Sequence, residues 1–396
     1  MVIVGGGPAG STTALALVHA RKELAGRVVV LERARFPRDK PCAGALGARG
    51  DALLRQLGVE IDVPSAPVDG IALRCGAGES VASPGRIGRV VRRIEFDHAL
   101  ARAAQARGIE VRDGVRVEAV RDEGAAGVVV ETSTGTLRAR VVVGCDGVGS
   151  IVRKALGHGA GRLRAQVVEV DTEPVASDPA RSLLLFDATD RTLPGYAWDF
   201  PTVVDGRPMV CRGVYRLKVE GEPDPGGPDV AARLDARLRR QGIDPSSCKN
   251  RRYAERGFEP LATVARGALM LAGEAAGIDP VTGEGIAQAI EYGVLAGQFV
   301  ADRLGEHGSV DAGAWNHVLR RSRLGRDLRI RTGFVGLFYG PARAEVEQFL
   351  VESPGPLHVG CQHFAAQPYD WLTLGDVVAR GAARLFAMRV ASALWG

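Results

Sequence analysis

The sequence is poor in cysteine and in lysine. Its six cysteines are scattered and form no C-x-x-C pair, which argues against a disulfide framework or a zinc site. The positive formal charge of +5 comes almost wholly from arginine. No block of lysine and arginine with interleaved aromatic residues is present, so we expect no nucleic-acid partner. We also expect no metal, because no histidines, cysteines and carboxylates are spaced as ligands.

Long hydrophobic runs are missing as well. No stretch of about 18 uninterrupted apolar residues occurs, so no membrane-spanning helix is expected. The chain opens directly on the apolar residues Val2-Ile3-Val4, without the basic leader of a signal peptide. Together with the scattered cysteines, these features predict a cytoplasmic location.

Glycine, by contrast, is abundant near the N-terminus. Gly5, Gly7 and Gly10 have the G-x-G-x-x-G spacing, between an apolar strand and a helical pattern. A second strand, over residues 27–31, ends at Glu32, whose carboxylate suits ribose hydroxyls. In such units glycine permits the tight turn, the backbone approach to a pyrophosphate and close helix–strand packing. The residues expected at this end of a dinucleotide are Gly5, Gly7, Ala9, Gly10, Glu32 and Arg33.

Two later apolar strands also end in glycine and a carboxylate. The apolar residues 141–144 stop at Cys145-Asp146-Gly147, and the apolar residues 268–271 stop at Gly273-Glu274. A loop and a helix from about Gly283 follow the second of these strands, and the positive end of that helix would stabilise a reduced flavin. Three glycine-lined strand ends therefore predict one long cofactor. The residues expected there are Asp146, Gly273, Glu274, Pro280, Gly283, Gly285 and Ile286.

The order of these motifs, with R-x-x-F-D at residues 93–97 between them, resembles the flavoproteins related to para-hydroxybenzoate hydroxylase. Two further segments narrow the resemblance. "RDKPCAGAL" at residues 38–46 is similar to the K-P-C-G-G-G-L segment of geranylgeranyl reductases, and "GYAWDFP" at residues 195–201 is similar to their Y-x-W-x-F-P segment. The resemblance covers about residues 1–300 and implies that the dinucleotide is FAD.

The resemblance also implies roles for single residues. Arg93 matches the arginine that the family turns toward the cofactor, and Val117 stands where relatives pack backbone against adenine. Cys42 and Ala43 lie in the loop that relatives place near the isoalloxazine. Glu274 replaces the usual aspartate and is one methylene longer, which puts its bond to the ribityl chain in doubt.

We expect an α/β fold in which a Rossmann-like FAD-binding domain carries an inserted antiparallel substrate sheet. The FAD-binding domain is predicted from residues 1–65, 86–165 and 255–305, the substrate-binding domain from 66–85 and 166–254, and a helical C-terminal region from 306–396.

Alternation along residues 195–201 places Tyr196, Trp198 and Phe200 on one face of a strand and Asp199 on the other. The three rings form either a packed core or an aromatic wall over the flavin. The candidate catalytic residues are Cys42, Tyr196 and Trp198, although a free cysteine such as Cys42 more often only packs as a small buried hydrophobe.

No second G-x-G-x-x-G occurs, so electrons are expected from transiently bound NAD(P)H or from a partner redox protein. The favoured function is FAD-dependent reduction of a C=C bond in a hydrophobic, isoprenoid-like or natural-product substrate. The alternatives are a flavin monooxygenase acting on an aromatic or polyketide metabolite, a flavin halogenase, and an electron-carrier flavoprotein. The amphipathic end of the chain is interpreted as a docking helix or as a peripheral membrane contact.

Overall fold

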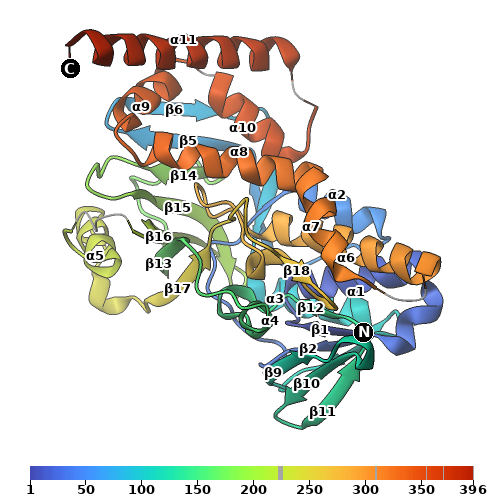
Figure 1. Ribbon diagram of the computed structural model, residues 1–396. Coiled ribbons are helices and arrows are strands. Elements are labelled where there is room, and N and C mark those ends of the chain that lie inside the picture. Colours follow the sequence, from blue (N-terminus) through green and yellow to red (C-terminus); the bar gives the residue numbers. More distant parts are fainter. Residues whose placement is uncertain (222–225, 308–309, 354, 369, 396) are drawn as a thin grey trace.

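The computed structural model describes residues 1–221, 226–307, 310–353, 355–368 and 370–395. Two large sheets dominate it (Figure 1), and the last helix of the chain lies along the edge of the molecule farthest from the N-terminus. The predicted α/β fold class is confirmed, including the helical C-terminal region. No described helix is both long and apolar enough to cross a membrane.

The first sheet has six strands and forms the dinucleotide-type half of the molecule. Its order is β18-β19-β12-β1-β2-β8, and all neighbours are parallel except β18 and β19. The strands are β1 (Val2–Val4), β2 (Val29–Leu31), β8 (Glu110–Arg112), β12 (Val142–Gly144), β18 (Ala265–Arg266) and β19 (Leu269–Leu271). Because β1, β2, β12 and β19 are parallel, their carboxyl ends meet at one edge, where ligands of such sheets bind.

Four helices pack on this sheet. They are α1 (Pro8–Ala20), α3 (Arg93–Gln105), α4 (Ile151–Ala155) and α6 (Ile286–His307). Helix α6 packs directly on α1, and an added Cβ at Gly297 would lie 2.5 Å from the carbonyl oxygen of Thr13. The prediction that α6 begins near Gly283 was wrong. Gly283 has φ +66° and belongs to the preceding turn, a conformation that a regular right-handed helix does not admit.

The second sheet has seven strands in the order β17-β13-β16-β15-β14-β5-β6. They are β5 (Gly70–Cys75), β6 (Gly78–Ala82), β13 (Leu163–Thr172), β14 (Leu183–Asp187), β15 (Gly195–Val204), β16 (Arg207–Val219) and β17 (Arg251–Arg256). The expected antiparallel pattern holds except at one position, since β14 and β5 are parallel. A parallel pair needs a crossover connection, which here is the long chain segment between residues 75 and 183.

Two small sheets complete the strands. One joins β3 (Ala45–Gly47), β7 (Gly88–Val91) and β4 (Ser65–Val68), and the other joins β9 (Val117–Asp122), β10 (Val128–Thr132) and β11 (Gly135–Ala139). The seven-stranded sheet thus takes its strands from residues 70–82 and 163–256, close to the predicted substrate segments. The domain boundaries themselves stay a prediction.

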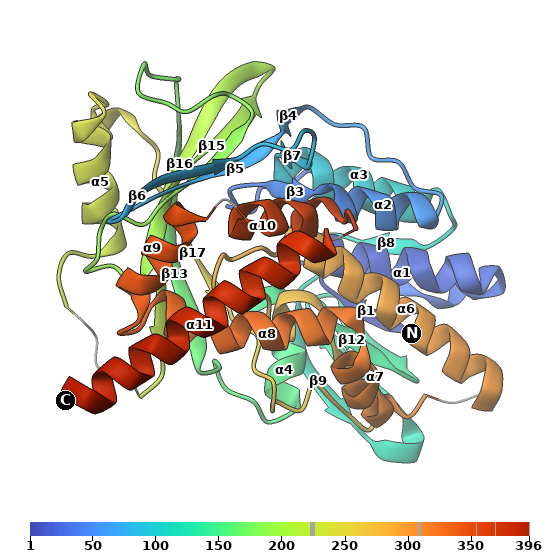
Figure 2. The ribbon, with the colours of Figure 1, turned by 90° about the horizontal axis from the view of Figure 1, so that it is seen from above.

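Helices lie on both sides of the seven-stranded sheet (Figure 2). Helix α5 (Val230–Arg240) packs on one face with Val168 and Val170. Helix α10 (Gly355–Ala365) belongs to the core of the other face, with Val167 and the aromatic residues of β15. The remaining helices are α2 (Ala48–Gln56), α7 (Trp315–Arg321), α8 (Arg323–Phe338), α9 (Arg343–Glu352) and α11 (Trp371–Trp395).

Candidate active site

A cavity of about 800 Å³ lies where the carboxyl edge of the six-stranded sheet meets the seven-stranded sheet and helices α8 to α10. Most of the predicted cofactor-binding residues line it: Gly5, Gly7, Ala9, Glu32, Arg33, Cys42, Ala43, Arg93, Val117, Asp146, Glu274, Gly283, Gly285 and Ile286. Gly10, Gly273 and Pro280 stand behind the wall. Residues that are far apart in the sequence therefore meet around one space.

The three glycines of the first motif differ in what a side chain at each position would contact. An added Cβ would lie 2.4 Å from the carbonyl oxygen of Cys145 at Gly5, and 1.9 Å from the carbonyl oxygen of Gly5 at Gly10. Both positions are closed by the protein itself. At Gly7 the nearest atom, a guanidinium nitrogen of Arg93, is 3.5 Å away, and φ is −78°, which any residue adopts. The backbone of Gly7 is therefore accessible from the cavity, and a ligand can contact it.

The predicted acid at the end of β2 lies beside this glycine turn. Glu32 is buried and accepts hydrogen bonds from the backbone N–H groups of Gly6 at 3.0 Å and Ala34 at 3.1 Å. Arg38 contacts Glu32 at 3.4 Å and Asp97 at 2.9 Å. Arg38 also lines the cavity and was missed from the sequence, where it appears only as the first letter of the "RDKPC" segment.

Arg93 also lies in the cavity wall, as the resemblance implied. Its guanidinium forms two parallel hydrogen bonds of 2.7 Å with the carboxylate of Asp97, one helical turn further along α3. Such a bidentate pair fixes the plane of the guanidinium. Arg93 is therefore held in place before any ligand arrives.

The carboxylate of Asp146 has a structural use. It accepts a hydrogen bond from the Ser150 hydroxyl at 2.6 Å and one from the backbone N–H of Ile151 at 2.7 Å, at the start of α4. The strand end Cys145–Gly147 still lines the cavity with its backbone. The glycines after β12 are thus explained by a backbone surface facing the cavity, with the carboxylate closing the turn beneath it.

Glu274, the residue with the extra methylene, reaches Lys40. Its Oε2 accepts a hydrogen bond from the Lys40 ammonium at 3.0 Å, and its Oε1 is buried without a hydrogen-bond partner. Both side chains line the cavity. An acceptor oxygen is therefore available at the place where the family's shorter aspartate stands.

Three tyrosines hold the loop before α6. The backbone carbonyls of residues 280–282 each accept a hydrogen bond from one of them. Tyr215 donates to the first carbonyl at 2.8 Å, Tyr339 to the second, and Tyr196 to the third. The hydroxyl of Tyr196, a predicted catalytic residue, thus positions this loop. Tyr215 is paired with Tyr196 across β15 and β16, whereas nothing in the sequence pointed to Tyr339.

The aromatic residues of β15 form a packed cluster that is also a cavity wall. Tyr196 stacks on Tyr215 with ring centroids 5.1 Å apart, and Trp198 lies 6.2 Å from both Tyr196 and Phe200. All four rings line the cavity. An added Cβ at Gly213, opposite Trp198, would lie 2.2 Å from the indole, so this glycine makes room for the ring. The rings are therefore both a packed cluster and a wall of the cavity, whereas their position over the flavin stays a prediction.

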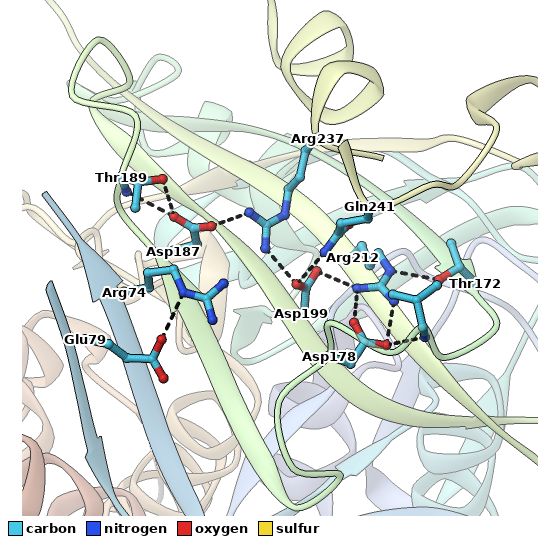
Figure 3. Close-up of polar contacts among 11 residues, drawn as sticks. Arg74, Glu79, Thr172, Asp178, Asp187, Thr189, Asp199, Arg212, Arg237 and Gln241 are labelled. Carbon is cyan, nitrogen blue, oxygen red and sulfur yellow. Dashed lines mark hydrogen bonds and ion pairs between the residues drawn. The ribbon is translucent and has the colours of Figure 1, made fainter. Parts of the chain in front are cut away.

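Asp199 points to the opposite face of the sheet, as the alternation predicted (Figure 3). There its carboxylate contacts Arg237 of α5 at 2.7 Å, Arg212 of β16 at 3.1 Å and Gln241 at 3.1 Å. Arg212 is fully buried and also pairs with Asp178. A network of ion pairs thus fixes the sheet from behind, while aromatic rings face the cavity.

Cys42 lies in the cavity wall beside Arg93. Its backbone N–H donates to the Glu169 carboxylate at 2.9 Å, which anchors the loop. Burial raises the pKa of the Cys42 thiol, and the charges of Arg93 and Lys40 oppose this only in part. The residue is therefore a neutral thiol near pH 7.

Residues 1–312 match the family described as FAD binding domain. The chain belongs to this family. A menaquinone reductase from Mycobacterium tuberculosis is 30% identical over 325 residues, which are 76% of each chain. A geranylgeranyl diphosphate reductase from Rhodobacter capsulatus is 29% identical over 76% of this chain and 73% of its own. A geranylgeranyl bacteriochlorophyll reductase-like protein from Thermoplasma acidophilum has a crystal structure with a TM-score of 0.70, at 20% identity over 89% of this chain and 90% of that one.

The predicted resemblance to geranylgeranyl reductases and the predicted cofactor are therefore confirmed, and the chain is an FAD-dependent oxidoreductase. The residues that line the cavity also fit FAD. Gly7 leaves the glycine turn open, and carboxylate oxygens of Glu274 and Glu284 are buried without hydrogen-bond partners. We expect the glycine turn, Glu32 and Arg38 to hold the ADP part, and the loop before α6 to hold the flavin. When bound, FAD supplies the transfer of electrons and hydride.

Proposed function

We propose that this enzyme reduces a C=C bond in a neutral, isoprenoid-like molecule. The observation that carries the proposal is the apolar half of the cavity, beyond the residues expected to hold FAD. Side chains from the seven-stranded sheet and from α8 to α10 line it: Ile71, Leu73, Val167, Leu184, Phe186, Trp198, Phe200, Phe338, Val346, Leu350, Leu357 and Phe364. Such a wall binds a hydrocarbon chain by excluding water from it.

The charges of the C-terminal helices favour a substrate without a diphosphate. Arg331 of α8 pairs with Asp279 and, at 3.1 Å, with Glu284. Arg343 of α9 pairs with Glu347 at 2.7 Å and also donates to backbone carbonyls at 2.6 Å. Both arginines line the cavity, and both are already neutralised by carboxylates. A multiply charged anion would need cations that are not committed elsewhere.

Menaquinone reductases, which are named among the relatives, suggest a polyprenyl chain on a neutral head group. The wall formed by Trp198 and Phe200 would orient the chain, and the loop held by the three tyrosines would fix the distance to the flavin. Holding a hydrocarbon against a fixed cofactor lowers the entropic part of the barrier.

The test is single-turnover reduction without oxygen. Enzyme reduced with dithionite should reoxidise when mixed anaerobically with a polyprenol, which has no quinone ring to take the electrons, and mass spectrometry should show a product heavier by two hydrogens. A polyprenyl diphosphate of equal length should react more slowly. No anaerobic reaction with any prenyl compound, together with a transient oxygen adduct of the flavin in air, would favour the monooxygenase instead.

We also propose the surroundings of the reaction. The protein works in the cytoplasm, and NAD(P)H or a redox protein reduces it. A peripheral membrane contact through α11 would give access to a lipid substrate. Trp371 and Leu372, at the start of α11, are 75% and 87% exposed, and Val378 is 61% exposed one to two turns later. The side chains after Arg384 lie outside the described residues. Co-sedimentation with vesicles, compared between the wild type and a Trp371→Ser/Leu372→Ser variant, tests this contact.

A further inference from the structure

Among the described residues, the carboxyl group of Glu255 in the cavity forms no ion pair or hydrogen bond. Glu255 lies near the end of β17 and lines the cavity. Its Oε2 is buried and makes no hydrogen bond. An added Cβ at Gly283, in the turn before α6, would lie only 2.6 Å from this oxygen. The carboxyl therefore faces the loop where the flavin is expected, and no hydrogen bond between the described residues uses its Oε2 to hold the fold.

The cations near Glu255 are taken by other acids. Lys40 pairs with Glu274 at 3.0 Å. Arg251 pairs with Glu169 at 3.2 Å and with Asp171 at 2.6 Å. Glu274 lines the cavity together with Glu255, and Glu169 lies nearby, where it accepts a hydrogen bond from the backbone N–H of Cys42. Glu255 is the one whose charge no described ion pair balances.

The surroundings of Glu255 make its ionisation harder on balance, although one cation opposes this. Burial is the main cause that raises the pKa of Glu255 to about 8, and the negative charges of Glu274, Glu169 and Asp279 add to it. The positive charge of Lys40 opposes them only in part. The hydroxyls of Tyr196 and Tyr215, also nearby, donate to backbone carbonyls and offer the carboxylate no hydrogen bond. Glu255 therefore carries a proton near neutral pH.

We propose that the Glu255 carboxyl is the proton donor of the reaction, which rests on the proposed reduction of a C=C bond. One alkene carbon accepts a hydride from the reduced flavin and the other accepts the proton of Glu255. The π bond breaks and two C–H bonds form, so the alkene gains the two electrons that the flavin loses. The Glu255 carboxylate then regains its proton from solvent.

Cys42 is the competing acid, since it also lies in the wall as a neutral group. Its thiol is a weaker acid than Glu255, because burial raises the pKa of Cys42 above the ordinary thiol value of 9.0. A donor works best when its pKa is close to the operating pH, which Glu255 satisfies. Cys42 is also adjacent to Arg93, whereas Glu255 faces the turn at Gly283.

The test compares Glu255→Gln with Glu255→Asp and with Glu79→Gln, an exposed carboxylate on the same sheet that pairs with Arg74. The first readout needs no turnover: the visible spectrum of bound FAD is titrated from pH 6 to 10. The wild type and Glu79→Gln should show a spectral step near pH 8, and Glu255→Gln should lack it. With neutral prenyl substrate, Glu255→Gln should lose on the order of 100-fold in the rate of flavin reoxidation. Glu255→Asp should recover part of that loss.

The possible failures are distinguishable. If the wild type reduces alkenes and Glu255→Gln reduces them within about threefold of the wild-type rate, Glu255 is not the donor. A spectral step that persists in Glu255→Gln would also overturn the assignment. A wild type that reduces no alkene at all overturns the proposed function and this assignment together. Comparison with Cys42→Ser shows whether the thiol takes the role instead.

Discussion

The two halves of the cavity are built by different means. At the edge of the six-stranded sheet and in the turn before α6, much of the wall is backbone, at Gly5, Gly7 and Gly283. In the apolar half the wall is side chain, contributed by strands and by helices more than a hundred residues apart, such as Trp198 and Phe364. A cofactor shared by many enzymes can be held by main-chain geometry, whereas a particular substrate needs particular side chains. Short glycine motifs in the sequence therefore identify the cofactor half of the cavity, whereas no such motif identifies the substrate half.

The sharpest way to test the backbone half is to add the same side chain at two glycines of one motif. Gly10→Val should fail to fold, because even its Cβ would overlap the carbonyl oxygen of Gly5. Gly7→Val should fold, because its Cβ finds ordinary contacts of 3.5 Å or more. It should nevertheless lose FAD, with at least a 100-fold weaker affinity, since the valine methyls occupy the space for the pyrophosphate.

Thermal unfolding followed by circular dichroism and FAD titration measure the two effects separately. Flavin occupancy equal to that of the wild type in Gly7→Val would show that the pyrophosphate lies elsewhere. A folded Gly10→Val variant would show that the turn is less closed than its contacts indicate.

The stability of the seven-stranded sheet can be tested through the ion pairs on the face of the sheet that α5 covers (Figure 3). Arg237 is buried and contacts Asp187 and Asp199. Arg237→Ala removes the ion-pair partner of Asp187 and leaves Asp199 with Arg212 alone, so it should lower the free energy of unfolding by about 3 to 5 kcal/mol. Arg74→Ala is the matched control on the same sheet: its partly exposed pair with Glu79 should contribute at most about 1 kcal/mol. Urea denaturation measures both.

FAD affinity of the folded Arg237→Ala protein should stay within about threefold of the wild type, because the cofactor edge belongs to the other sheet. A large loss of FAD affinity would mean that the two halves are coupled through the sheet.

A buried histidine that makes stability depend on pH lies where the C-terminal helices meet the FAD-binding half. His363 of α10 is 3.9 Å from Asp327 of α8, and burial lowers the pKa of His363 to about 3, with Arg331 and Arg49 adding to the shift. Below pH 6.5 His363 binds a proton in the unfolded chain but stays neutral in the folded chain. The free energy of unfolding therefore decreases as the pH falls. Between pH 7 and 5 this amounts to about 2 kcal/mol.

His363→Gln should remove that part of the acid sensitivity, whereas His19→Gln, at an exposed position on α1, should not. Unfolding free energies at pH 5 and 7 give the comparison. Equal pH dependence in the wild type and in His363→Gln would exclude His363 as the sensitive group.

The same contrast explains how far the sequence could lead. The glycine motifs, Glu32 and the alternation around Trp198 led to the fold, to a long cofactor and to the aromatic wall, because each is a local pattern with one physical cause. That the cofactor is FAD came from the family resemblance. Arg38, Glu255 and Tyr339 were missed, since their roles depend on which distant element they face. The parallel pairing of β14 with β5 was missed for the same reason: strand alternation gives the faces of a strand and not the direction of its neighbour.

The smallest predicted effect asks whether the C-terminal region helps to hold the cofactor. Tyr339 lies beyond residues 1–312, which match the FAD-binding family, yet its hydroxyl donates to the carbonyl of Val281 in the loop before α6. Tyr339→Phe removes one hydrogen bond and should cost about 1 kcal/mol, which is about a fivefold weaker affinity for FAD. Tyr292→Phe is the control, because the Tyr292 hydroxyl donates to Gly277, behind the cavity wall. It should reduce stability by a similar amount and leave FAD affinity unchanged. Equal FAD affinity in Tyr339→Phe and the wild type would confine cofactor binding to the six-stranded half, while the expected loss would show that the substrate half also sets the position of the flavin.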